Sequence, residues 1–222
     1  MSSGVPPRCI YCGVRDGATS DHTPPRCFFD LLAEGTQRIT VPCCETCRRA
    51  GEADDAFVRN LLVSSVEAES NGYGNGFLSE KRNRSFVKDR TMLPKIVETM
   101  KLARVELPDG SYLSVAPAFE LNRPECDRFF KRMGRALLHE AMNTGFVDCS
   151  IDWNPHSDFG FKHAFLQRAT VVREVSPEFA FAAHQGKQEG VWFFLMTFFG
   201  RDFIFRLVAN GVPPNHVREA LE

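Results

Sequence analysis

Two cysteine pairs near the N-terminus constrain the fold of this chain more than any other feature. Cys9 and Cys12 form one Cys-x-x-Cys turn, and Cys44 and Cys47 form a second. Each turn places two sulfur atoms close together, so the two turns can complete a tetrahedral thiolate site for a structural Zn²⁺ ion. Residues 13–43 separate the turns, a longer segment than in a compact zinc ribbon. We therefore expect a metal site with an inserted segment.

Two alternatives to this ligand set remain open. The pairs could form reversible disulfides, and Cys43 could replace Cys44, although the x-x spacing favours Cys44. The N-terminus has no hydrophobic signal region, and no run of about 18 apolar residues occurs, so we expect a cytoplasmic protein without a membrane span, whose thiols stay reduced. The remaining cysteines are expected to be small buried hydrophobic residues: Cys27, Cys126 and Cys149.

The composition permits a folded core but excludes a chain that attracts nucleic acid through its overall charge. Of the 222 residues, 43% are hydrophobic and 25% charged, and the net charge is −1. Any basic surface must therefore be local. The run 81–90 is basic and is either a solvated helix face or a phosphate contact through Lys81, Arg82 and Arg84. A predicted helix could extend such a surface with four further cations: Arg128, Lys131, Arg132 and Arg135.

Hydrophobic periodicity predicts mixed secondary structure. A β-branched strand over 38–41 should end at Pro42, and a helix should begin near Glu52, with Asp54 and Asp55 in its first turn, where the helix dipole favours acidic residues. The glycines and asparagines of 70–76 predict a boundary or hinge. Further helices are predicted at 28–33, 93–100, 122–143 and after 213, a hairpin at 103–107 and 112–115, and strands at 161–167, 179–183, 191–199 and 203–208.

The segment between the cysteine pairs carries the most reactive short run, Asp21-His22-Thr23-Pro24-Pro25. With the flanking pairs, and with Val41-Pro42 before the second pair, residues 9–59 resemble the zinc-stabilised HNH endonucleases of the ββα-metal fold, and most closely a bacterial and phage group. The resemblance implies that His22 is the general base that activates water. It also implies that Asp21 helps to hold a catalytic Mg²⁺ or Mn²⁺ ion at the scissile phosphate.

Two positions depart from that pattern. Arg48 follows the last cysteine, where the family usually has Asn or His, and a guanidinium cannot ligate a cation. Ile39 falls near the central Asn of the motif and has no polar group. Asp54 and Asp55 align with an acidic pair of the family's helix, so either could supply a second carboxylate instead of favouring the helix start. Without a catalytic ion, Arg48 and Arg49 would contact phosphate directly.

These features predict an α+β protein with a zinc-bound ββα (HNH-like) module at 1–70 and a helix-plus-antiparallel-sheet domain at 77–222. Two functional hypotheses follow. The first is an HNH-like endonuclease that hydrolyses phosphodiester bonds in DNA with a divalent metal. The second is a non-catalytic zinc module that binds nucleic acid or a protein partner. Asp21 and His22 favour the first hypothesis, whereas Arg48 and Ile39 favour the second.

Overall fold

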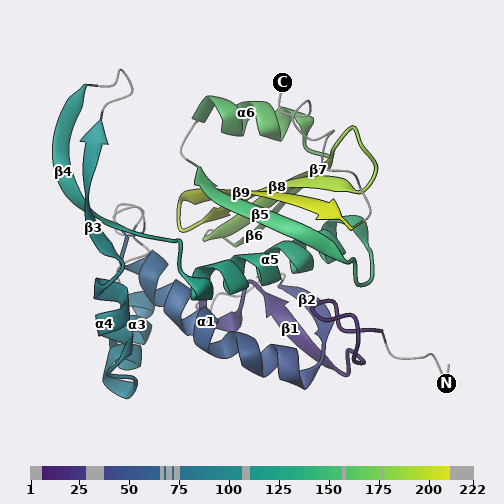
Figure 1. The fold of residues 1–222 in the computed structure, drawn as a ribbon, viewed down its shortest axis with the longest axis horizontal. Helices are drawn as coiled ribbons and strands as arrows, with labels where there is room; N and C mark the ends of the chain where they lie inside the picture. The colour runs from purple at the N-terminus through teal and green to yellow at the C-terminus, as the bar shows by residue number, and fades with distance from the viewer. Residues whose placement is uncertain are drawn as a thin grey trace.

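The computed structural model describes residues 7–28, 38–65, 68, 72, 76–106, 111–156, 159–176 and 178–210. Helices and antiparallel strands are mixed, as expected of an α+β fold (Figure 1). In chain order the elements are β1 (Thr19–Thr23), the 3-10 turn η1 (Arg26–Phe28), β2 (Ile39–Cys43), α1 (Glu45–Val63), α3 (Phe77–Lys88), α4 (Met92–Val97), β3 (Met100–Glu106), β4 (Tyr112–Phe119), α5 (Pro124–Met142), β5 (Cys149–His156), α6 (Phe159–Arg168), β6 (Val171–Ser176), β7 (Phe179–Gln185), β8 (Val191–Phe198) and β9 (Arg201–Ala209).

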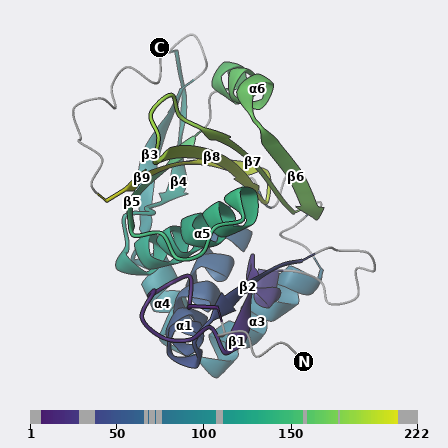
Figure 2. The ribbon, with the colours of Figure 1, turned by 90° about the vertical axis from the view of Figure 1, so that its right-hand side faces the viewer.

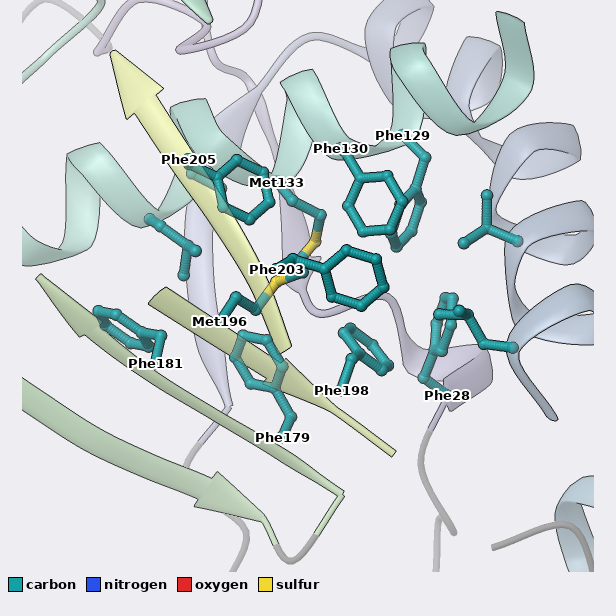
Figure 3. Packing of buried hydrophobic residues seen from close by; sticks show 14 of the residues in the cluster. Phe28, Phe129, Phe130, Met133, Phe179, Phe181, Met196, Phe198, Phe203 and Phe205 are labelled. Carbon is teal, nitrogen blue, oxygen red and sulfur yellow. The ribbon is translucent and has the colours of Figure 1, made fainter. Parts of the chain in front are cut away.

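Helix α5 lies at the centre of the molecule. One side of it packs against the five-stranded sheet, in the order β5-β9-β8-β7-β6, and the other faces α1 and the small β1–β2 sheet (Figures 1 and 2). Phe129, Phe130 and Met133 of α5 are buried against aromatic side chains of the sheet (Figure 3). The predicted amphipathic helix at 122–143 is therefore confirmed, because its apolar stripe covers the sheet.

The large sheet is buried on both faces, which explains its continuous apolar strands. Along β8, Phe194, Met196 and Phe198 face α5, whereas Phe193 and Leu195 belong to a second apolar cluster with Phe165 and Phe161 of α6. Adjacent strand residues point to opposite faces, so a strand covered on both sides needs no polar alternation. Figure 2 shows α6 above the sheet and α5 below it.

The N-terminal part consists of two antiparallel strands followed directly by a helix. Asp21 pairs with Val41 and His22 with Thr40 across β1 and β2. The prediction that Pro42 ends the second strand is wrong, because Pro42 pairs with Ser20 inside β2. The β1–β2 sheet has only two strands, so a proline can occupy the side of β2 where no ladder hydrogen bond is needed.

Two other predictions need correction, and two strands were not predicted. Helix α1 begins at Glu45, not near Glu52, because Cys44 caps it and accepts a hydrogen bond from the Cys47 amide. The segment predicted as a strand at 161–167 is α6, in which Phe161 and Phe165 lie one turn apart and face the sheet. The sequence did not identify β5 and β6 as strands. Short apolar runs fit either type of element, and packing decides between them.

The remaining predictions have mixed outcomes. Strands β7, β8 and β9 and the hairpin β3–β4 occur where they were predicted, and α4 is shorter than predicted. The predicted helix at 28–33 lies largely outside the described residues, as do most of the 70–76 boundary and the helix after 213. None of the helices in the described ranges has the length and apolar character to cross a bilayer.

Phe28 joins the N-terminal strands to the C-terminal sheet. Its fully buried ring lies 5.4 Å from the ring of Phe129 and 4.8 Å from that of Phe198, measured between centroids (Figure 3). One hydrophobic cluster thus includes residues from α1, α5 and the sheet. The division into domains 1–70 and 77–222 stays a prediction, but the apolar contacts run across it.

We expect Phe28→Ala to lower the free energy of unfolding by about 3–5 kcal/mol, since it leaves a cavity among three rings. In a chain of this size that loss lowers Tm by roughly 6–20 °C. Urea denaturation followed by fluorescence and circular dichroism measures the change. Val87→Ala is the control, because Val87 is 80% exposed and its truncation should leave stability within about 0.5 kcal/mol. Unchanged stability of Phe28→Ala would contradict the shared core.

Candidate metal centre and adjoining acidic pocket

The four cysteines of the two pairs lie together. Cys9 and Cys12 come from the loop before β1, and Cys44 and Cys47 from the junction of β2 and α1. Their sulfur atoms all lie within 4.8 Å of one another. Cys9 and Cys44 are buried, whereas Cys12 and Cys47 are half-buried. A tetrahedral thiolate site needs this separation between sulfurs, so the four could hold a metal ion such as zinc.

Backbone hydrogen bonds shape the first cysteine turn and tie it to the second. The Gly13 amide donates to the Cys9 carbonyl oxygen at 2.9 Å, and Gly13 adopts φ +65°, a left-handed conformation that glycine adopts without a steric penalty. The Ile10 amide donates to the Pro42 carbonyl oxygen at 3.1 Å. This contact joins the first turn to β2, which leads into the second turn.

The thiols are in an environment that favours thiolate at some positions and opposes it at others. A backbone hydrogen bond from Cys47 lowers the pKa of Cys44 to about 6, and hydrogen bonds from the Arg15 and Val14 backbone lower the pKa of Cys12. Burial and the neighbouring sulfurs raise the pKa of Cys47. Four adjacent thiolates repel one another, so all four can ionise together only when a cation lies between them.

Cys43 is not a member of this group. Its Sγ lies 3.3 Å from the Thr19 hydroxyl oxygen on β1, its side chain is buried, and burial raises the pKa of its thiol. The structure thus distinguishes the two candidates, since Cys44 points to the other three sulfurs and Cys43 does not. Of the three cysteines expected to be buried, Cys126 and Cys149 are buried, whereas Cys27 is only half-buried.

Asp21 and His22 line one pocket of about 440 Å³ between the β1–η1 segment and α1. The wall includes further charged groups from η1 and from three turns of α1. These are Arg26, Arg48, Glu52 and Asp55. Residues at 48, 52 and 55 lie on one face of a helix, so α1 presents a mixed row of charges to the strand that carries Asp21.

The first cysteine turn holds the carboxylate of Asp21. The Tyr11 hydroxyl donates to Asp21 Oδ2 at 2.9 Å, and the His22 backbone amide donates to Oδ1 at 3.0 Å. Burial, together with the negative charge of Asp21, raises the pKa of Tyr11 well above its usual value, so the hydroxyl keeps its proton. Tyr11 lies between Cys9 and Cys12, so the position of Asp21 depends on the loop that carries two of the four thiols.

His22 is suited to accept a proton at neutral pH. Burial lowers the pKa of its imidazole, and the positive charges of Arg26 and Arg38 lower it further, while Asp21 opposes the change. The neutral ring is therefore the dominant form at pH 7. Its Nδ1 lies 3.4 Å from the Thr40 hydroxyl oxygen on the paired strand, a long contact that gives the ring some orientation.

The placement of Asp54 and Asp55 in the first turn of a helix is wrong, because α1 starts at Glu45 and both lie in its middle. Both are buried and bonded to α5. Arg128 donates to Asp54 at 2.9 and 2.7 Å, and Arg132 donates to Asp55. Burial raises the pKa of Asp55 to about 7, with Arg132 opposing and Asp21 adding to the shift. Asp55, not Asp54, reaches the pocket of Asp21.

The basic residues predicted to contact nucleic acid lie in two places. Arg48 lines the pocket and is bonded to Glu45 at 2.8 Å and to Glu52 at 2.9 Å, while Arg49 is exposed and bonded to Glu45 at 2.6 Å. The hydrogen bonds from Arg48 and Arg49 lower the pKa of Glu45 to about 2. Helix α3 carries the other three, none of which lines this pocket: Lys81, Arg82 and Arg84.

Two residues of the site have roles that the sequence did not reveal. Tyr11 lies ten positions from Asp21, and no pattern links the two. Arg132 pairs with Asp55 across 77 positions. The i, i+4 spacing of Arg128 and Arg132 on α5 was a signal that the two share a face, but only the packing of α5 on α1 shows which carboxylates they meet.

Comparison with known proteins adds no relative. Neither the protein-family models, nor the curated proteins, nor the solved structures include a match to this chain.

We expect Cys44→Ser to reduce bound zinc from about one ion per chain to almost none, because a hydroxyl is a poor replacement for a thiolate. If the ion contributes even ~3 kcal/mol of folding free energy, Tm should fall by roughly 6–12 °C. Elemental analysis and thermal denaturation measure both effects. Cys43→Ser is the matched control and should retain the metal, since its Sγ faces Thr19. Equal zinc loss in both variants, or none in either, would contradict this ligand set.

Proposed function

We propose that the chain is an HNH-like endonuclease that hydrolyses phosphodiester bonds in DNA with a divalent metal, and that its four cysteines bind a structural zinc ion. The observation that carries this proposal is the geometry around one pocket. A strand–strand–helix unit brings Asp21, His22 and Asp55 to the same cavity, and Tyr11 of the first cysteine turn donates a hydrogen bond to Asp21. A carboxylate next to a neutral imidazole is the set of groups that metal-assisted hydrolysis requires.

The donor set of this pocket fits a hard divalent cation. Mg²⁺ is commonly held by one or two carboxylates together with water and substrate phosphate oxygens. Asp21 and Asp55 supply two carboxylates, and the hydrogen bonds to Asp21 leave lone pairs on both of its oxygens. In the described part of the chain, only the four cysteines form a group of three or more close ligand atoms. In the acidic pocket the protein would therefore supply only part of the coordination shell of the divalent ion, and the substrate would complete it.

Each residue has a defined role in this proposal. His22 would accept the proton of the attacking water, and Asp21, with Asp55, would hold the ion. When bound, the ion would neutralise charge on the phosphate and stabilise the leaving oxygen. Tyr11 keeps Asp21 in place through its hydroxyl, and Arg132 holds Asp55 from α5. The zinc ion would act only on stability, because four sulfur ligands leave no open position on it.

The two departures from the HNH pattern have different consequences. The guanidinium of Arg48 is bonded to two carboxylates, Glu45 and Glu52, so its charge is compensated and repels a cation in the pocket less than an unpaired arginine would. Ile39 is buried and pairs with Thr23, so it serves the core and contributes no ligand. The pocket offers few ligands to a metal and has Arg48 in its wall. These two features support the alternative, a non-catalytic zinc module that binds nucleic acid or a protein.

We expect the purified protein to nick supercoiled plasmid in the presence of Mg²⁺ or Mn²⁺, and His22→Ala to reduce the rate by about 10²–10⁴-fold, as loss of a general base does. Agarose gel assays over a time course measure the rate. His163→Ala is the matched control, because His163 lies on the exposed face of α6, and its loss should leave the rate unchanged. Absence of cleavage by the wild type with every divalent ion would refute the nuclease and leave the binding module.

We also expect Tyr11→Phe to lower the cleavage rate by about 10-fold or more and to raise the Mg²⁺ concentration that gives half the maximal rate. The substitution removes the hydrogen bond to the Asp21 carboxylate but keeps the aromatic ring. Zinc content and Tm should change little. Tyr112→Phe on β4 is the control, because that ring is exposed. An unaltered metal requirement in Tyr11→Phe would mean that the hydroxyl does not position Asp21.

A further inference from the structure

A second pocket lies between α1 and α5, on the other side of α1 from the pocket of Asp21 and His22. It has a volume of about 350 Å³, and we refer to it as the arginine pocket. Four cations and one carboxylate contribute to its wall. The lining residues are Tyr11, Cys47, Ala50, Gly51, Asp54, Arg128, Lys131, Arg132 and Arg135. A cavity with this excess of positive charge is suited to an anion.

Helix geometry brings the four cations together. Positions 128, 131, 132 and 135 follow the i, i+3, i+4, i+7 pattern of a single helix face, while the opposite side of α5 is apolar and buried in the sheet. Across from them, α1 presents Ala50 and Gly51. A Cβ atom at Gly51 would overlap the guanidinium of Arg132, so the absence of a side chain there makes room for the cation.

Internal contacts leave donors of these cations available. Arg128 uses Nε and Nη2 for Asp54, which leaves Nη1. Arg132 binds Asp55 through Nη2, and its buried Nη1 has no hydrogen-bond partner among the described residues. An arginine has five N–H donors in a planar fork, so the exposed Arg128 can bind a carboxylate and a second oxyanion at the same time, whereas Nη1 of Arg132 is packed against Gly51.

The positive charge of the pocket is also not fully compensated. Lys131 is bonded to Asp127, and both side chains are about half exposed. Arg135 donates to two backbone carbonyl oxygens, that of Val147 at 2.9 Å and that of Cys149 at 3.4 Å. Among the described residues, no carboxylate is its hydrogen-bond acceptor. Four cations thus have three carboxylate partners in the described ranges, which leaves the charge of Arg135 without one.

We propose that the arginine pocket binds a phosphate group. A phosphate presents several oxygens to donors that converge from different directions, and arginine binds it in a bidentate manner. The group could belong to the backbone of a nucleic acid or to free phosphate, and both share this chemistry. The assignment of this phosphate to a nucleic-acid backbone rests on the proposed function. In that case the phosphate would belong to the same nucleic acid that the zinc module would cleave. The phosphate site itself does not depend on cleavage.

The test uses the full-length zinc-loaded protein with His22→Ala as background and no added divalent ion, so that binding is measured without cleavage. One arm measures the Kd of a fluorescent duplex DNA of about 15 base pairs as a function of salt concentration. The other measures the rise in Tm caused by inorganic phosphate. Lys131→Ala removes a cation, and Ala50→Glu places a carboxylate at the exposed rim of the pocket. Lys95→Ala on α4 is the matched control, because Lys95 is exposed and remote from the pocket wall.

We expect Lys131→Ala to weaken DNA binding about 3- to 10-fold and to reduce the slope of log Kd against log salt by about 1, as the loss of one phosphate contact does. Ala50→Glu should weaken binding more, and Lys95→Ala should have no effect. If both pocket variants abolish only the stabilisation by inorganic phosphate, the site binds free phosphate and not a backbone.

Two outcomes would overturn the proposal. In the first, neither arm changes in the pocket variants. In the second, the variants lose zinc, which would mean that the cations compensate the charge of the metal–thiolate group, whose Cys47 lines the pocket, instead of binding a ligand. Because the background lacks His22, neither outcome bears on the nicking assay, and an inactive nuclease would leave the phosphate site intact.

Discussion

The convergence of four sulfur atoms from two distant turns is the constraint on which the site depends. Repulsion among four thiolates is strong unless a cation compensates it, so the metal that could bind there would hold the loop of Cys9 and Cys12 against the start of α1. Tyr11 lies within that loop and fixes the Asp21 carboxylate through its hydroxyl. The geometry of the acidic pocket and the integrity of the cysteine group are therefore not independent, even though none of the four grouped thiols lines that pocket.

Helix α5 connects the pocket to the rest of the molecule in two ways. Its apolar stripe, with Phe129 and Phe130, packs on the sheet and on Phe28 of the N-terminal segment. Its opposite face holds Asp54 and Asp55 of α1 through Arg128 and Arg132. Each buried carboxylate needs such a partner, because an unpaired buried charge is costly. The C-terminal half thus contributes directly to the position of a carboxylate in the proposed active pocket.

The balance of charge within the acidic pocket separates the two functional hypotheses. Arg48 would oppose a catalytic ion if its charge were isolated, but Glu45 and Glu52 compensate it. The same arginine could contact a phosphate in a protein that only binds, so its presence is compatible with both functions. Burial and two nearby arginines favour a neutral His22, which can accept a proton, and the endonuclease hypothesis requires that property. The arginine pocket on the far side of α1 suits a phosphate under either hypothesis.

The sequence by itself determined the parts of this protein that local chemistry controls. The spacing of the cysteines predicted which four thiols meet, and the periodicity of 122–143 predicted α5. It misplaced the start of α1, and with it the role of Asp54 and Asp55, and it took α6 for a strand. The tertiary structure alone decided which carboxylate of α1 lines the pocket of Asp21 and His22, that Tyr11 orients Asp21, and that Arg132 meets Asp55. Those contacts join residues up to 77 positions apart, and pairing at such separation depends on how helices pack and not on any local preference of the chain.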